Sequence, residues 1–123
     1  MNKMIHCIAG IGLAMSTAYA IAQQKPVVVD GNVWMNASTE TRKAFLAGAN
    51  SMISLEMAYA RKKGTQAPAG GTAFYAATGQ MTLDEMSERI TRWYQSNPER
   101  RHMPVLGAAW IDMVSPGAAK PVK

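Results

Sequence analysis

Hydrophobic positions between Ser38 and Gly64 repeat with the period of an α-helix. They form two parallel rows, one of Leu46, Ala49, Ile53, Met57 and Ala60 and the other of Phe45, Met52 and Tyr59. Together the rows make a broad apolar face, which is typical of a helix packed on a core. Ser38 is suited to the N-cap, Glu40 to the first turn and Arg61–Lys63 to the last turn. Because Gly64 is a usual helix stop, we predict one long helix between Ser38 and Gly64.

A second helix is predicted from Thr82 to Ser96. Thr82 and Glu85 have the spacing of a capping box, in which each side chain accepts a hydrogen bond from the other residue's backbone amide. The apolar stripe that follows consists of Leu83, Met86, Ile90, Trp93 and Tyr94. Trp93 and Tyr94 are therefore expected to anchor the core, and Asn97-Pro98 ends the helix.

A shorter third helix is predicted after Pro104, which has the backbone constraint of a first helical turn. Its apolar positions are Leu106, Ala109, Trp110, Met113 and Val114. Pro104 and Trp110 are thus expected to be structural anchors. The helical domain would span residues 38–115, and residues 116–123 would be a disordered tail.

Residues 64–80 are rich in Gly, Ala, Thr and Pro and show no helical or strand period, so we expect a long loop. Loops of this length are uncommon in small domains unless they have a function. Phe74 and Tyr75 stand out within it. They either pin the loop to the core or contact a partner.

Residues 23–37 are expected to be an extended N-terminal segment. Val27–Val29 and Val33–Met35 flank the turn signal at Asp30 and could pair as a small hairpin, although an isolated hairpin is marginally stable. Trp34 is expected to be a packing anchor under the first and third helices. The fold class is therefore all-α, a small bundle of about three to four helices.

Residues 1–22 have the layout of a secretory signal peptide. Lys3 precedes an apolar stretch over residues 5–14, and small residues follow at the sites where a signal peptidase would cut. We expect cleavage after Ala22 or, alternatively, after Ala20, giving a periplasmic or secreted protein. The apolar stretch is shorter than the roughly 20 residues that span a bilayer. An uncleaved membrane anchor is the competing interpretation.

Cleavage would change the chemistry of the chain, because its one cysteine, Cys7, lies in the removed segment. The mature chain would then have no disulfide and no thiol nucleophile. Removal of Lys3 would lower the formal charge from +5 by one unit. A mildly basic exported protein fits an acidic protein partner or a weak contact with an anionic membrane surface better than nucleic acid. Solubility alone would also explain the charge.

Catalytic and metal-binding patterns are not found in the mature sequence. His102 is its one histidine, and no G-x-S-x-G nucleophile turn accompanies it. Glu56 lies beside the first apolar row and is either a carboxylate at the edge of that face or one held in a pocket. An enzyme would require Glu56 or His102 to line a pocket. We expect no enzyme, no metal and no cofactor.

Two stretches resemble a known family. The first is DGNVWMNASTETRKAFLAGANSM, residues 30–52, and the second is MTLDEMSERITRWYQSNPERRHMPV, residues 81–105. They are similar to the Rap/Tai-type immunity proteins of type VI secretion amidases. The resemblance implies a small helical periplasmic protein that binds and blocks a cell-wall-cleaving amidase. Members of that family commonly carry cysteines that can form a disulfide, whereas the mature chain here has none.

Two functions remain as expectations. The first is a protein-binding protein of immunity type that occludes its partner, with Phe74, Tyr75, Arg100, Arg101 and His102 as candidate contacts. The second is an envelope accessory or structural protein without a toxin partner. The partner could also be a second copy of the chain.

Overall fold

The computed structural model describes residues 28–116. The predicted signal peptide lies outside this range, and so does residue 117 onward of the predicted tail. Seven helical elements follow one another in the chain: α1 (Gly31–Asn36), α2 (Thr39–Lys63), α3 (Ala69–Thr78), α4 (Leu83–Ser96), the 3-10 turn η1 (Pro98–Arg100), α5 (Val105–Ala109) and the π-helical turn η2 (Trp110–Val114). Over residues 28–116 the only β pairing is an isolated bridge between Asp30 and Pro104. The all-α prediction is confirmed.

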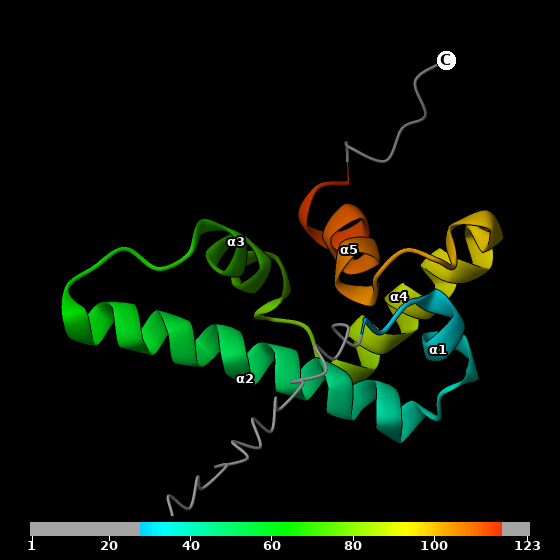
Figure 1. Cartoon of the computed structure of the whole chain (residues 1–123), viewed down its shortest axis with the longest axis horizontal. Coiled ribbons are helices and arrows are strands. Elements are labelled where there is room, and N and C mark those ends of the chain that lie inside the picture. Colours follow the sequence, from blue (N-terminus) through cyan, green and yellow to red (C-terminus); the bar gives the residue numbers. More distant parts are fainter. Residues whose placement is uncertain (1–27, 117–123) are drawn as a thin grey trace, which may run out of the picture.

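Helix α2 is the longest element, and the other helices lie along one of its sides (Figure 1). Its ends are those that the sequence predicts. The Ser38 hydroxyl accepts a hydrogen bond of 3.2 Å from the Thr41 amide. At the other end Gly64 adopts the left-handed conformation with φ of 64°, and its amide donates to the Ala60 and Arg61 carbonyls. Local signals therefore determine where this helix begins and ends.

Helix α4 lies at the centre of the fold and confirms the second predicted helix. The Thr82 amide donates to Glu85 Oε2 at 2.7 Å, and the Glu85 amide donates to Thr82 Oγ1 at 3.2 Å, so the capping box is complete. Trp93 and Tyr94 are buried, as predicted, with their rings edge to face at 5.2 Å between centroids. The core around α4 consists of Trp34, Leu46, Phe74, Met86, Ile90, Trp93, Tyr94, Val105, Ala108, Ala109 and Met113.

The expected extended segment and hairpin are wrong for residues 31–36, which form α1. The Asp30 carboxylate caps this helix by accepting hydrogen bonds from the Asn32 and Val33 amides at 2.9 and 3.0 Å. These bonds stabilise the charged carboxylate, and that from Val33 contributes most to lowering the pKa of Asp30. The turn signal at Asp30 thus marks a helix start. The amides of a first helical turn have no acceptor within the helix, and the Asp30 side chain supplies one.

Trp34 is a packing anchor, as predicted, and is buried. Its ring meets Phe45 of α2 edge to face with 6.3 Å between centroids, and its Nε1 donates to Thr91 Oγ1 of α4 at 3.0 Å. Trp34 therefore packs between the first and second predicted helices, not under the first and third.

The predicted loop over residues 64–80 is also wrong in part, since residues 69–78 form α3. Phe74 is 5% exposed and belongs to the core, where it holds α3 against the rest of the fold. Gly71 lies close to α2, because a Cβ on it would be 3.5 Å from Ile53 Cγ2. Tertiary packing, which sequence periodicity does not reveal, makes this segment helical despite its two glycines.

The last predicted helix begins directly after Pro104, as expected, although the Pro104 side chain is exposed. The neighbouring Val105 is fully buried, and its amide donates to the Val29 carbonyl at 2.9 Å. Trp110 is 37% exposed, so its prediction as a buried anchor is wrong. The Ser115 amide donates to the Trp110 carbonyl at 2.8 Å, an i to i+5 bond that makes a wider π turn of the residues after Trp110.

Candidate functional site

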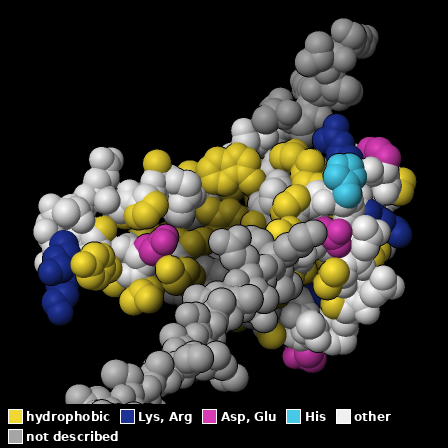
Figure 2. All heavy atoms as spheres, in the orientation of Figure 1, with side chains coloured by type: hydrophobic (Ala, Val, Ile, Leu, Met, Phe, Trp, Pro, Cys, Tyr) yellow, Lys and Arg dark blue, Asp and Glu magenta, His cyan; other side chains and the backbone are white. Residues whose placement is uncertain are grey.

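A groove opens between α2, α3 and the α5–η2 segment. We call it the α3–α5 groove and define it by the residues that line it: Ile53, Glu56, Gly70, Gly71, Phe74, Leu106 and Trp110. Its volume is about 290 Å³. Hydrophobic side chains gather between α3 and α5 on the face shown in Figure 2. Three separate elements therefore build one apolar depression.

The walls of the groove follow from the local sequence. Gly70 and Gly71 have no side chains, so the first turn of α3 leaves space. A Cβ added to Gly70 would have no neighbouring atom within 4 Å. On the opposite wall Leu106 and Trp110 are one helical turn apart, with exposed fractions of 41% and 37%. Phe74 is buried and forms part of the floor. Two large apolar side chains thus face a gap left by two glycines.

Glu56 is the one carboxylate in the lining. It is partly buried, and its Oε2 would lie 3.7 Å from a Cβ at Gly71. None of the ion pairs formed within residues 28–116 includes Glu56. Of the two interpretations that the sequence left open, the structure therefore favours a carboxylate held in a pocket. An acid beside a tryptophan in an apolar setting can receive a cationic side chain with an aliphatic stem.

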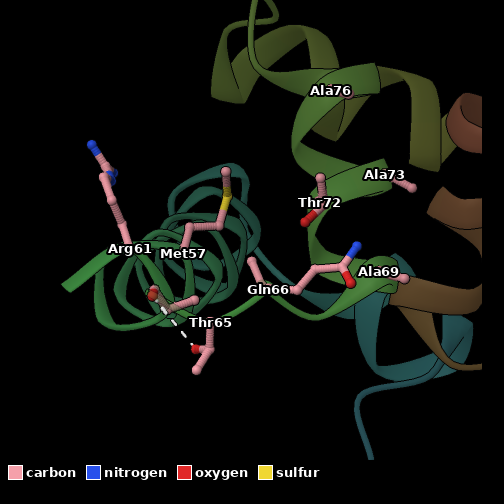
Figure 3. A pocket seen from close by; sticks show the side chains of 10 residues that line it. Met57, Arg61, Thr65, Gln66, Ala69, Thr72, Ala73 and Ala76 are labelled. Atoms are coloured by element: carbon pink, nitrogen blue, oxygen red, sulfur yellow. Dashed lines mark hydrogen bonds between the residues drawn. The ribbon is translucent and has the colours of Figure 1, made fainter. Parts of the chain in front are cut away.

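A second, wider depression of about 700 Å³ lies between the C-terminal half of α2 and α3. Figure 3 shows Met57 on α2 and Thr72 and Ala73 on α3 along its sides, with Arg61 pointing away from α3. The Thr65 hydroxyl donates to the Ala60 carbonyl at 3.5 Å. Half of the residues that line it are alanine, and the lining includes no acid, histidine or cysteine. This surface offers shape and apolar contact rather than reactive groups.

The predicted contact residues do not come together. Phe74 is buried and pins its segment to the core, the first of its two interpretations, whereas Tyr75 is 48% exposed on α3. Arg100 ends η1, and Arg101 and His102 follow it, in a segment that Figure 1 shows on the far side of α5 from α3. The sequence-selected contacts therefore mark two distant surfaces instead of one site.

The basic segment is tied to its own end of the fold. Arg100 forms an ion pair with Glu99 at 3.7 Å, and the Arg101 carbonyl accepts from Asn32 Nδ2 at 3.4 Å. Arg101 Nε is buried and has no hydrogen-bond partner within residues 28–116. His102 is exposed and does not line the α3–α5 groove. An acid and an imidazole therefore do not meet in the groove.

The shifted pKa values have structural causes outside the groove. Hydrogen bonds from Lys43 to Glu40 and Asp84 raise the pKa of Lys43. Burial raises the pKa of Tyr94 to about 12, and its hydroxyl donates to the Met103 carbonyl at 2.7 Å. Residues 28–116 contain no group of three or more His, Cys, Asp or Glu that could hold a metal ion.

Comparisons with known proteins do not assign the chain to a family: no family model, no curated protein and no solved structure matches it. Over residues 28–116 no helix is long and apolar enough to cross a membrane. Sequence reasoning missed Leu106 and Trp110 as exposed groove residues. Their spacing of four residues was a usable signal, because it places both on one face of a helix.

Proposed function

We propose that this is an exported protein that binds and occludes a protein partner, such as a cell-wall amidase toxin, without catalysing a reaction itself. The two stretches that resemble Rap/Tai-type immunity proteins suggest this role. The observation that carries the proposal is the α3–α5 groove, in which exposed Leu106 and Trp110 accompany Glu56, a carboxylate that forms no ion pair within residues 28–116. Tryptophan is among the residues most enriched at the energetic centres of protein interfaces, and a carboxylate beside it adds a charge that the partner has to match.

The groove sets a requirement for the partner. A lysine or arginine side chain could lay its stem along Trp110 and Leu106 while its cationic head reaches Glu56. Removing one member of such a desolvated charge pair costs about 2–5 kcal/mol of binding free energy. The partner would therefore present a basic residue within an apolar surface patch.

The test is calorimetric titration of the mature chain, residues 23–123, with an amidase encoded beside its gene. We expect a complex at micromolar concentration or tighter and loss of peptidoglycan cleavage by the bound enzyme. Glu56→Gln should weaken binding at least about 30-fold, which corresponds to about 2 kcal/mol. The matched control is Glu88→Gln, because Glu88 is exposed, pairs with Arg92 at 3.5 Å and lies outside the groove.

No complex at micromolar concentration would contradict the amidase partner. A complex that Glu56→Gln and Trp110→Ala both leave unchanged would contradict the groove as the binding surface. The envelope accessory or structural role is the alternative. A gene neighbourhood of envelope-assembly functions, together with failure to bind amidases, would favour it.

A further inference from the structure

A second apolar surface runs along the outer side of α2. We call it the α2 seam and define it by Gly48, Met52, Leu55 and Tyr59. The three large side chains are 54%, 61% and 61% exposed in that order. Two of them, Met52 and Tyr59, belong to the second apolar row of the sequence, whereas Leu46 and Ala60 of the first row are buried. The helix therefore carries more apolar surface than its own fold covers.

The spacing of the seam indicates what kind of surface covers it. Successive members are four, three and four residues apart, so all four lie along one side of the helix over three turns. A stripe of this kind is one that a second helix can follow by packing its own ridge of side chains along it. A helix buried only against its own domain does not need a second stripe of this kind.

We propose that the α2 seam pairs with the α2 seam of a second copy in antiparallel orientation, giving a homodimer. Arg61, Lys62 and Lys63 occupy the last turn of α2, and all three are exposed. A parallel pair would bring the two basic runs together. An antiparallel pair separates them and also places opposite ends of the two helix dipoles side by side.

The seam also fixes the register. In an antiparallel pair with Met52 opposite Leu55 of the second copy, Gly48 lies opposite Tyr59 of the second copy. A Cβ added to Gly48 would have no neighbouring atom within 4 Å, so the space beside Gly48 is open. A glycine facing a tyrosine gives the alternation of small and large side chains that lets two helices interdigitate.

The size of the seam predicts a weak dimer. Stable protein interfaces bury about 800 Å² on each partner, more than three half-exposed side chains and their neighbours supply. We therefore expect a dissociation constant on the order of 10–100 µM. This association requires no amidase and stands apart from the function proposed above.

Sedimentation equilibrium of the mature chain from about 5 µM to about 1 mM tests the dimer in that range. The wild type should move from monomer to dimer. Leu55→Lys should leave a monomer throughout, while Ser54→Lys, which adds the same charge at an exposed position outside the seam, should still dimerise. Gly48→Leu should weaken the dimer while improving helix propensity, so loss of association would not reflect loss of folding.

Single cysteines test the orientation, because the mature sequence has no other. In the proposed register Tyr59 of one copy and Tyr59 of the other are offset by 11 residues, which is about 16 Å along the helix axis. An oxidised mixture of the Gly48→Cys and Tyr59→Cys variants should therefore give the mixed disulfide, and Tyr59→Cys alone should not cross-link. A wild type that stays monomeric at about 1 mM, as it would if another segment of the chain covered the seam, overturns the proposal. Equal disruption by Ser54→Lys and Leu55→Lys also overturns it.

Discussion

Replacing Gly31 by alanine should destabilise the protein strongly, although the change adds only one methyl group in the first turn of a helix. A Cβ at this position would lie 2.4, 2.6 and 2.8 Å from Cε1, Cδ1 and Cζ of Tyr94. Because carbon atoms pack at about 3.5–4.0 Å, the ring would have to move by about 1 Å. Tyr94 is fully buried against Trp93, so the ring has no free space to enter.

The cost can be worked from these contacts. Overpacking a core costs about 1–3 kcal/mol. Moving the ring also strains the 2.7 Å hydrogen bond from the Tyr94 hydroxyl to the Met103 carbonyl, and a bond of this kind contributes about 1 kcal/mol. Alanine recovers up to about 0.5–1 kcal/mol over glycine within a helix. The net loss should be about 2–3 kcal/mol, or about 10–20 °C in Tm for a domain of this size.

Thermal and urea unfolding followed by circular dichroism would measure the effect. The matched control is Gly48→Ala, because Gly48 lies within α2 and no atom stands within 4 Å of its added Cβ. That variant should gain about 0.5–1 kcal/mol at a concentration of about 5 µM, where the chain is monomeric. If Gly31→Ala is as stable as the wild type, the close packing of α1 on Tyr94 is refuted.

Four further predictions concern the core, its pH dependence and a helix cap. Tyr94→Phe should lose about 1 kcal/mol with the hydrogen bond to Met103. Burial raises the pKa of Tyr94 to about 12 in the folded state, above its ordinary value of about 10. The neutral hydroxyl therefore adds to the free energy of unfolding in full below pH 10, and this contribution is lost as the pH rises from 10 to 12. Urea unfolding at several pH values in that range should show the free energy of unfolding of the wild type falling with pH. An equally steep fall in Tyr94→Phe would contradict Tyr94 as its source. Trp34→Ala should cost about 3–5 kcal/mol by urea unfolding, whereas a cost below 1 kcal/mol would mean that Trp34 is not a core residue. Thr82→Ala should cost about 1 kcal/mol through the lost capping box with Glu85, and an unchanged Tm would show that the cap is not stabilising.

Local signals in the sequence were sufficient for the two main helices. Ser38 and Gly64 bound α2, and Thr82 with Glu85 begins α4, because cap residues satisfy backbone groups within a few positions of themselves. These features depend on neighbours in the chain and can be read without the fold.

Helix α3 could not be predicted in this way. Its AGGTAF start has two glycines and no regular apolar stripe, so the local preference is for a loop. Phe74 and the close approach of Gly71 to Ile53 provide the missing stability through contacts distant in sequence. The α3–α5 groove was hidden for the same reason, since one of its walls is a helix that exists only because it packs.

Trp110 shows a different limit. Sequence periodicity assumes 3.6 residues per turn, and the bond from the Ser115 amide to the Trp110 carbonyl spans five residues. Val105 and Ala108 precede this wider turn and are buried, while Leu106 and Trp110 face outward, so the buried face of the helix is offset from the predicted one. The residue types were recognised as apolar, but nearly every position of this short helix is apolar, so tertiary packing decides which face is buried.

The uneven support of α2 divides the molecule into regions of different local stability. The N-terminal half of α2 packs near α1 and α4, where Phe45 meets Trp34, but its C-terminal half is covered mainly by α3. If α3 separates, about 12 residues of helix lose their cover, and a helix of that length is marginal in water. Amide hydrogens of α3 and of residues 52–63 should therefore exchange together, at a lower free energy than those of α4. A ligand in the α3–α5 groove, which Ile53 and Glu56 of α2 also line, would slow that exchange and so stabilise the last turns of the longest helix beyond its own contacts.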